Sequence, residues 1–233
     1  MKNLAIIPAR GGSKRIPRKN VKDFCGKPIM TYPIEAALKS GIFDEVMVST
    51  DDEEIAAVAR QYGASVPFMR SEATSNDYTP VGDVVREVLG EYEKRGQIFD
   101  YVFCLYATSA FTKPDILQGM MKQLQENPHI SQTNVMTPCL FTPLRTKYFK
   151  DDGELAYMFP GYATTRTQDL TPCYHDAGIA YAARADMYSE KIPWAGIVSG
   201  YVVDPMYAQD VDTPDDWEMA EFKYEYLKRK GKI

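Results

Sequence analysis

The sequence has few of the residues that bind soft metals or form disulfides. Its 233 residues include four cysteines, without a Cys-x-x-Cys pair, and only two histidines. Scattered cysteines are typical of reduced thiols in a cytosolic chain, and so few histidines disfavour a structural zinc site. A metal bound by this protein is therefore expected to be a hard cation with oxygen ligands.

Long apolar runs and an excess of basic residues are also missing. No run approaches the roughly 20 apolar residues of a membrane span. Pro8 and Arg10 interrupt the N-terminal stretch where the apolar region of a signal peptide would lie. The net charge of −5 disfavours general nucleic-acid binding. We expect a cytoplasmic protein that binds neither membranes nor nucleic acid.

Two common phosphate-binding fingerprints are absent. Counted from Gly11, Ile16 stands where a Walker A loop has its second glycine. Gly11 and Gly12 are adjacent, so the Gly-x-Gly-x-x-Gly signature of dinucleotide-binding domains is absent too. These differences disfavour P-loop NTPases and Rossmann-type dehydrogenases.

The N-terminal stretch nevertheless combines a buried strand with a cationic loop. The apolar run 4–7 predicts a strand that ends near Pro8, because proline cannot donate a ladder hydrogen bond. The loop that follows contains two glycines, one serine and five cations, which are Arg10, Lys14, Arg15, Arg18 and Lys19. Glycines let backbone amides turn toward an anion, and flexible cations suit a polyphosphate. A solvated basic loop is the alternative, but the position after a buried strand in an acidic protein favours phosphate binding.

Strands and helices alternate after this loop. Strands are predicted at 46–50, 65–69, 101–106, 133–139, 178–182 and 197–203, and helices begin at Pro28, near Asp51, at Pro80, at Pro114 and at Pro214. The acidic run 51–54 indicates a helix start rather than a metal site, because acids stabilise the first turn of a helix. The alternation predicts a single α/β domain, 1–233, with a doubly wound, mostly parallel sheet. Ligands of such sheets bind at the carboxyl ends of the strands.

The segment 142–174 interrupts this alternation and is predicted to form an inserted irregular or β arm. It is rich in proline, glycine, tyrosine and threonine, and 151–153 has the Asp-Asp-Gly pattern of a hairpin turn. The aromatic residues Tyr148, Tyr157, Phe159 and Tyr162 either form a partner surface or pack as a satellite of the core.

Two aspartates near the C-terminus are candidate metal ligands. Asp210 and Asp212 are two residues apart, so on an extended segment both carboxylates point to the same face. They have no cationic neighbour in sequence, and a divalent cation such as Mg²⁺ would relieve their repulsion. The equal alternative is that Asp210 is solvated and Asp212 only precedes the helix cap.

The stretch Ile-Pro-Ala-Arg-Gly-Gly-Ser-Lys-Arg-Ile-Pro-Arg-Lys-Asn, 7–20, resembles the opening signature of the CMP-acylneuraminate synthetases. These cytidylyltransferases activate sialic-type nine-carbon sugars and the related octulosonate with CTP. The resemblance extends over nearly the whole chain. It implies a fold of the nucleotide-diphospho-sugar transferase type, a homodimer, and an arm used for dimerisation and for closing the sugar site.

The resemblance also implies roles for individual residues. Nucleotide contacts are expected from Ala9, Arg10, Gly11, Gly12, Ser13, Lys19, Asn20, Arg70 and Asp77, and catalytic roles from Arg10, Lys14, Lys19 and Asp212. Sugar contacts are expected from Tyr106, Thr108, Ser109, Arg166, Gln168, His175 and Asp176. The motif Asp-Val-Asp-Thr at 210–213 resembles the late family motif that holds the catalytic metal, which favours Asp210 and Asp212 as Mg²⁺ ligands.

Departures from the sialate pattern fall on the sugar side. The segment 105–112 reads Leu-Tyr-Ala-Thr-Ser-Ala-Phe-Thr rather than Leu-Gln-Pro-Thr-Ser-Pro-Leu-Arg, and 174–178 reads Tyr-His-Asp-Ala-Gly. The second segment most resembles the pseudaminic acid cytidylyltransferases of bacterial flagellin glycosylation. The expected reaction is CTP + pseudaminic acid → CMP-pseudaminic acid + pyrophosphate.

Several alternatives remain open from the sequence. The sugar is alternatively sialic or legionaminic acid, and the chain is alternatively a nucleotide-binding regulator without activity, since fold alone does not fix function. His175 is either a general base or a sugar contact.

Overall fold

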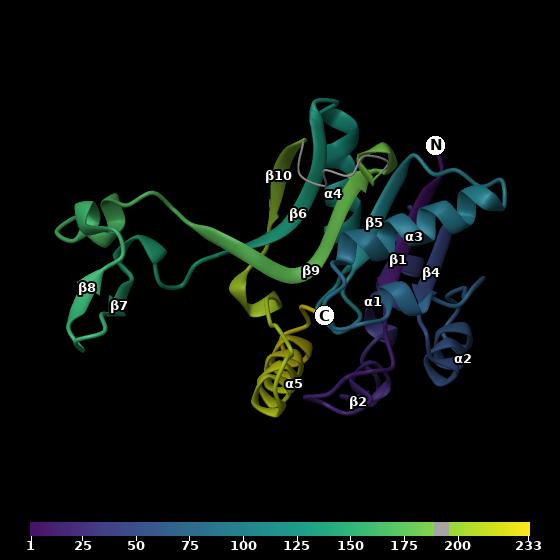
Figure 1. Ribbon diagram of the computed structural model, residues 1–233, viewed down its shortest axis with the longest axis horizontal. Coiled ribbons are helices and arrows are strands. Elements are labelled where there is room, and N and C mark those ends of the chain that lie inside the picture. Colours follow the sequence, from purple (N-terminus) through teal and green to yellow (C-terminus); the bar gives the residue numbers. More distant parts are fainter. Residues whose placement is uncertain (189–195) are drawn as a thin grey trace.

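A six-stranded, mostly parallel sheet forms the centre of the computed structural model, which describes residues 1–188 and 196–233 (Figure 1). The strands are β1 (Asn3–Pro8), β4 (Glu45–Ser49), β5 (Tyr101–Leu105), β6 (Ile130–Pro138), β9 (Tyr174–Arg184) and β10 (Ile197–Val202). Their order is β10-β6-β9-β5-β1-β4. Among these described strands, only β9 runs antiparallel to its neighbours, β5 and β6. The predicted α/β class is confirmed.

Helices cover both faces of this sheet, as β1 shows residue by residue. Ala5 and Ile7 belong to a cluster with α1 (Thr31–Ser40), α2 (Glu53–Gln61) and α4 (Pro114–Glu126). Leu4 and Ile6 point to the other face and pack with α3 (Val81–Lys94). Because alternate residues of a strand point to opposite faces, a strand buried on both faces reads as a continuous apolar run.

The helix termini agree with local capping chemistry at three predicted positions. Asp52 caps α2 by accepting from the Ile55 amide. Thr213 forms a capping box with Asp216 at the start of α5 (Pro214–Arg229). Gly41 follows α1 with a left-handed φ of 67°.

Two predicted elements are wrong. Pro28 does not begin a helix: Lys27–Pro28 (β3) pairs with Asp23–Phe24 (β2), and α1 starts at Thr31. The turn between β2 and β3 uses positive φ at Cys25 and Gly26, which a helix start does not supply. The segment 65–69 is not a strand, because only Ser65 bridges to Met47 and Pro67 has no amide to donate.

The arm at 142–174 extends away from the sheet beyond the ends of β6 and β9 (Figure 1). It contains the hairpin of β7 (Lys147–Phe149) and β8 (Leu155–Tyr157), with Gly153 at a φ of 84°, as its turn residues predict. Tyr148, Phe159 and Tyr162 are exposed, so the satellite-core interpretation of these side chains is wrong. In the described parts of the chain, no helix is both long and apolar enough to cross a membrane.

Candidate active site

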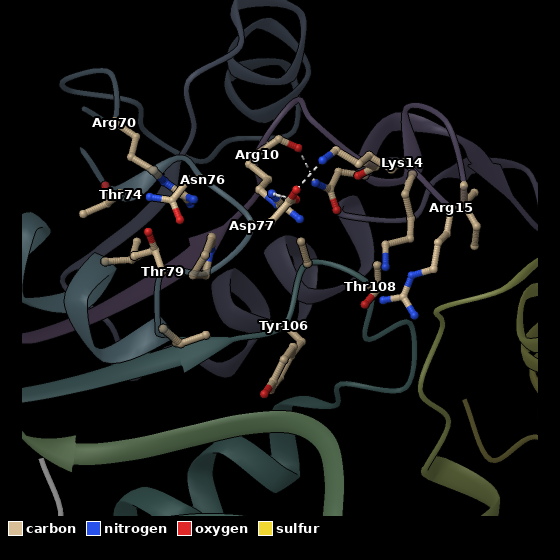
Figure 2. Close-up of a pocket in the computed structure, with 18 residues that line it drawn as sticks. Arg10, Lys14, Arg15, Arg70, Thr74, Asn76, Asp77, Thr79, Tyr106 and Thr108 are labelled. Carbon is tan, nitrogen blue, oxygen red and sulfur yellow. Dashed lines mark hydrogen bonds and ion pairs between the residues drawn. The ribbon is translucent and has the colours of Figure 1, made fainter. Parts of the chain in front are cut away.

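A polar cavity of about 320 Å³ lies at the carboxyl ends of β1 and β5, where the sheet topology predicts a ligand site (Figure 2). Three loops line it. The predicted site residues that it brings together are Arg10, Ser13, Lys14, Lys19, Asn20, Arg70, Tyr106 and Thr108, together with Asp77. Ala9, Gly11 and Gly12 lie in the same basic loop but do not line the cavity.

The basic loop is fastened to the start of α2. The Gly11 amide donates to Asp51 Oδ1 at 2.9 Å, and Asn20 Nδ2 donates to the Arg10 carbonyl at 3.0 Å. A Cβ on Gly11 would lie 2.7 Å from Asp52 Oδ2, whereas one on Gly12 would meet nothing within 4 Å. Neither glycine has a positive φ, so Gly11 is required for close approach rather than for backbone freedom.

Arg18 has the unusual backbone in this loop, with a φ of 54°. Its guanidinium donates to Asp52 at 2.5 and 2.9 Å and also pairs with Glu54. Hydrogen bonding to Arg18 lowers the pKa of Asp52 to about 2. The predicted helix-start role of Asp52 is therefore confirmed, and Asp52 has a second role that sequence reasoning missed: it holds the basic loop.

Asp77 neutralises two of the loop cations in this structure. It accepts from Lys14 Nζ at 2.5 Å and from Arg10 Nη1, as the dashed lines in Figure 2 show. These two hydrogen bonds, that of Lys14 first, hold the pKa of Asp77 below its usual range. Asp77 therefore occupies donor groups of Arg10 and Lys14 that would otherwise be free to bind an anion in the cavity.

Arg70 is buried beside the same cavity, with 8% of its surface exposed. It donates from Nε to Ser49 Oγ at 3.0 Å and from Nη2 to the Ser49 carbonyl at 2.5 Å. Burial lowers the pKa of Arg70, and the charge of Asp51 opposes that shift. A guanidinium held in this way is a fixed positive charge at the cavity wall.

The aspartate pair meets the basic loop on one side of the cavity. Lys19 Nζ donates to the Val211 carbonyl at 2.7 Å and lies 3.6 Å from Asp212 Oδ1, and Arg15 Nη2 lies 2.9 Å from the same oxygen. Asp212 therefore has two cationic neighbours in space, although it has none in the local sequence.

Asp210 is the less compensated member of the pair. Burial, followed by the charges of Asp212 and Asp176, raises the pKa of Asp210. Among the described residues, no group of three or more His, Cys, Asp or Glu side chains is arranged to hold a metal by itself. Mg²⁺ commonly binds one or two carboxylates together with substrate phosphates, and the pair Asp210–Asp212 fits that mode.

The sugar-side candidates divide into those that reach the cavity and those that do not. Tyr106 and Thr108 line it, and Tyr106 Oη is 3.0 Å from Tyr181 Oη, which donates to Asp176 Oδ2 at 2.5 Å. Ser109 is buried, and its amide closes the turn after β5 by donating to the Tyr106 carbonyl, so it does not line the cavity.

His175, Arg166 and Gln168 lie outside the cavity of their own chain. His175 is next to Asp176 on β9, so its side chain points to the opposite face, and Nδ1 lies 2.8 Å from the Asp176 carbonyl oxygen. Arg166 is on the arm and pairs with Asp169 at 2.6 Å.

Several cavity residues were not predicted from the sequence. Arg15, Thr74, Asn76 and Thr79 line the cavity, and Asp51 and Tyr181 support it. Arg15 was visible in the cationic run, and 74–79 in the polar loop before α3, but neither signal assigns a contact. Tyr181 lies in an apolar strand and gave no signal.

Comparison with known proteins agrees with this geometry. The profile of the family described as "Cytidylyltransferase" matches residues 4–179. The pseudaminic acid cytidylyltransferase of Campylobacter jejuni subsp. jejuni serotype O:2 is 42% identical over 226 residues, which cover 96% of this chain and 97% of that protein.

The chain belongs to the cytidylyltransferase family. It is also 34% identical to the CMP-N,N'-diacetyllegionaminic acid synthase of Legionella pneumophila, over 95% of each chain. Its fold matches that of the CMP:2-keto-3-deoxy-manno-octonic acid synthetase complexed with CTP, with a TM-score of 0.72 and 22% identity over 97% of this chain and 99% of that chain. In this fold the cations of the basic loop gather at the carboxyl ends of β1 and β5, the edge where parallel sheets usually bind ligands.

Proposed function

We propose that this cytidylyltransferase converts CTP and pseudaminic acid to CMP-pseudaminic acid and pyrophosphate in the cytoplasm, for glycosylation of bacterial surface proteins such as flagellin. The main support is the contact of Asp212 with Arg15 and Lys19, two cations of the basic loop that line the cavity, together with 42% identity to a pseudaminic acid cytidylyltransferase. The anomeric hydroxyl of the sugar attacks the α-phosphorus in line. The new P–O bond forms as the bond to pyrophosphate breaks, and the hydroxyl proton is released.

The cations of the cavity suit the charge that develops in this reaction. Arg10, Lys14 and Lys19 would bind the triphosphate, and the buried Arg70 adds a charge that needs no rearrangement. Fixed charges of this kind stabilise the transition state of phosphoryl transfer mainly by positioning and electrostatics. Because His175 lies outside the cavity, we assign no general base.

Mg²⁺ is the cofactor that we propose for the pair Asp210–Asp212. The raised pKa of Asp210 reflects burial and carboxylates in mutual repulsion, which a divalent cation would relieve. When bound with the triphosphate, the metal would neutralise charge on its oxygens. The residues of this chain contribute the two carboxylates and the cations Arg15 and Lys19 beside Asp212.

The arm is proposed to join two copies of the chain. Phe149 and Leu155 on the arm, and Phe141 directly before it, are 74, 57 and 91% exposed, a large apolar surface for a single copy. The contribution of Arg166 and Gln168 to a sugar site would then come from the arm of the second copy. Light scattering of the wild type and of Phe149→Glu tests this: a dimer that becomes a monomer supports it, and a monomeric wild type contradicts it.

Pyrophosphate release with CTP, Mg²⁺ and a panel of nonulosonic acids tests the activity. We expect the highest kcat/KM with pseudaminic acid. A preference for N,N'-diacetyllegionaminic or N-acetylneuraminic acid would instead assign the sugar of the more distant relatives. Tight CTP binding without turnover of any sugar would identify a nucleotide-binding regulator.

A further inference from the structure

A chain of three side chains leads from β9 to the edge of the cavity. Asp176 Oδ2 accepts from Tyr181 Oη at 2.5 Å, and Tyr181 Oη lies 3.0 Å from Tyr106 Oη. Figure 2 shows Tyr106 at the side of the cavity nearest β9, with its hydroxyl directed away from Arg10 and Lys14. These three hydrogen-bonded side chains therefore reach the part of the cavity that lies away from Arg10 and Lys14.

An irregularity in β9 brings these side chains onto one face. Met136 pairs with Asp176 and Asn134 with Tyr181, so a step of two residues along β6 corresponds to a step of five along β9. Gly178, at a φ of 65°, lies within this bulge, and its amide donates to Asp176 Oδ1 at 2.7 Å. Without the bulge, residues five apart on a strand would point to opposite faces.

The hydrogen bonds among Asp176, Tyr181 and Tyr106 can be donated in only one consistent direction. An ionised carboxylate accepts hydrogen bonds and cannot donate. Tyr181 must therefore use its single proton on Asp176, so the bond between the tyrosines is donated by Tyr106. The oxygen of Tyr106 then has no proton left for the cavity and offers only a lone pair to a ligand.

Both tyrosine hydroxyls stay protonated in this arrangement. Burial, the largest cause for each, raises the pKa of Tyr106 and of Tyr181, and the hydrogen bond to Asp176 raises that of Tyr181 further. Neither tyrosine is therefore a general base. The hydrogen bonds instead orient the Tyr106 hydroxyl.

We propose that Tyr106 accepts a hydrogen bond from an N–H or O–H group of the sugar, and that Tyr181 and Asp176 are positioning residues that set this polarity. The proposal rests on the proposed function and adds the direction of one hydrogen bond to it. Acylamino N–H groups, as on a diacetylated nonulosonic acid, are suitable donors. A sugar that presents a carbonyl oxygen at this point would be disfavoured.

Asp176→Asn is the most direct test, because a backbone contact fixes the orientation of the asparagine side-chain amide. The Gly178 amide donates to Oδ1, so the side-chain carbonyl oxygen of the variant stays there and its NH₂ group faces Tyr181. That NH₂ group must donate to Tyr181. Tyr181 then donates to Tyr106, and the Tyr106 proton is turned into the cavity, where it meets the donor of the sugar.

The experiment measures KM and kcat for pseudaminic acid by pyrophosphate release at saturating CTP and Mg²⁺, with CTP affinity measured separately by calorimetry. Tyr106→Phe, which removes the accepting oxygen, should raise the sugar KM by about tenfold and leave the CTP affinity within about twofold. Asp176→Asn should raise the sugar KM further, because the Tyr106 hydroxyl and the donor group of the sugar then face each other. Adding Asp176→Asn to Tyr106→Phe should have little further effect, since no hydroxyl remains to be reversed.

Tyr92→Phe is the matched control. Tyr92 Oη lies 3.1 Å from a carboxylate, Glu45, but on α3 away from the cavity, so its loss should leave both the sugar KM and the CTP affinity unchanged. Unchanged CTP affinity also shows that each variant is folded. A sugar KM in Tyr106→Phe within about twofold of wild type would overturn the proposal. So would a full additional effect of Asp176→Asn in the Tyr106→Phe background, which would indicate that Asp176 contacts the sugar itself.

Failure of the proposed function gives a different result. A wild type that releases no pyrophosphate with any nonulosonic acid contradicts the activity and, with it, this inference. An active wild type whose Tyr106, Tyr181 and Asp176 variants behave like it contradicts the inference alone. Tyr181→Phe should match Tyr106→Phe in direction with a smaller rise in sugar KM, because Tyr106 keeps its oxygen but loses its orientation.

Discussion

Lys19 Nζ lies 3.6 Å from Asp212 Oδ1 and donates to the neighbouring Val211 carbonyl at 2.7 Å. One residue belongs to the first loop of the chain and the other to the segment before the last helix. The contact places a cation expected to bind phosphate beside a carboxylate expected to bind a metal. Substitution of Lys19 should therefore affect CTP binding, whereas substitution of Asp212 should affect the chemical step.

Replacing Lys19 with alanine should weaken CTP binding by about 10- to 100-fold, the usual effect of losing a charged hydrogen-bonding partner. The sugar KM should change much less, because Lys19 belongs to the basic loop. Calorimetry with CTP and steady-state kinetics with sugar measure the two effects. Lys39→Ala is the control, since Lys39 pairs with Glu35 on α1, outside the cavity. Equal losses for both substrates would contradict the nucleotide assignment.

Asp212→Ala should lower kcat by more than about a hundredfold, because a metal ligand acts in the chemical step. Removal of this carboxylate also frees Arg15 and Lys19, so CTP binding without metal should be retained or strengthened. Asp215→Ala, a change in the first turn of α5, is the matched control. Chelation of Mg²⁺ should abolish wild-type turnover, and near-normal activity of Asp212→Ala in Mg²⁺ would remove the metal role.

Asp77→Asn should bind CTP several-fold more tightly, because Arg10 and Lys14 no longer have to exchange a carboxylate for phosphate. The lowered pKa of Asp77 fixes the sign of the pH effect: the carboxylate stays ionised until the pH falls below the usual aspartate value of about 3.9. Acidification from about pH 8 to about pH 5 should therefore not release these cations in the wild type. Weaker CTP binding by Asp77→Asn would show instead that Asp77 orients them for the nucleotide.

Asp52→Ala should lower the free energy of unfolding by about 1 to 2 kcal/mol, as the loss of a helix cap usually does. Because Asp52 has a pKa of about 2 in the folded chain, its contribution is present above about pH 4, where the unfolded carboxyl is ionised, and is lost as the pH falls through about 2. Urea unfolding of the wild type and variant across this range measures it. Glu53→Gln, another first-turn acid of α2, separates capping from the helix dipole.

The two adjacent glycines offer a matched pair for the support of the basic loop. Gly11→Ala should displace the loop and raise the CTP KM, because its Cβ would lie 2.7 Å from Asp52 Oδ2. Gly12→Ala meets nothing within 4 Å and should leave stability close to that of the wild type. Thermal unfolding and CTP titration of both variants check this, and identical behaviour of the pair would exclude steric contact with Asp52 as the cause.

Local signals were sufficient for much of the fold. The helix caps at Asp52 and Thr213 and the stop at Gly41 depend on residues within one turn, so the sequence predicts them directly. The helix predicted to begin at Pro28 was wrong because a proline suits both a helix start and a short β-ribbon. The positive φ at Cys25 decides for the ribbon.

The site was less accessible to sequence reasoning where it depends on strand register. The resemblance placed Arg10, Lys19 and Asp212 in one site, and the structure brings them together. The bulge in β9 determines that Tyr181 shares a face with Asp176 and that His175 does not, and this register is set by pairing with β6. No local pattern in 174–181 specifies it.

The path of β9 has a mechanical consequence. This single strand begins beside the arm, passes Asp176 and Gly178, and ends at Arg184 on the far side of the sheet (Figure 1). Asp176 is the third residue of this strand and closely follows the arm, whereas the basic loop is far from the arm in the sequence. A change in the sequence of the arm should therefore displace the backbone at Asp176 more than that of the basic loop, and we expect it to alter sugar preference more than CTP affinity.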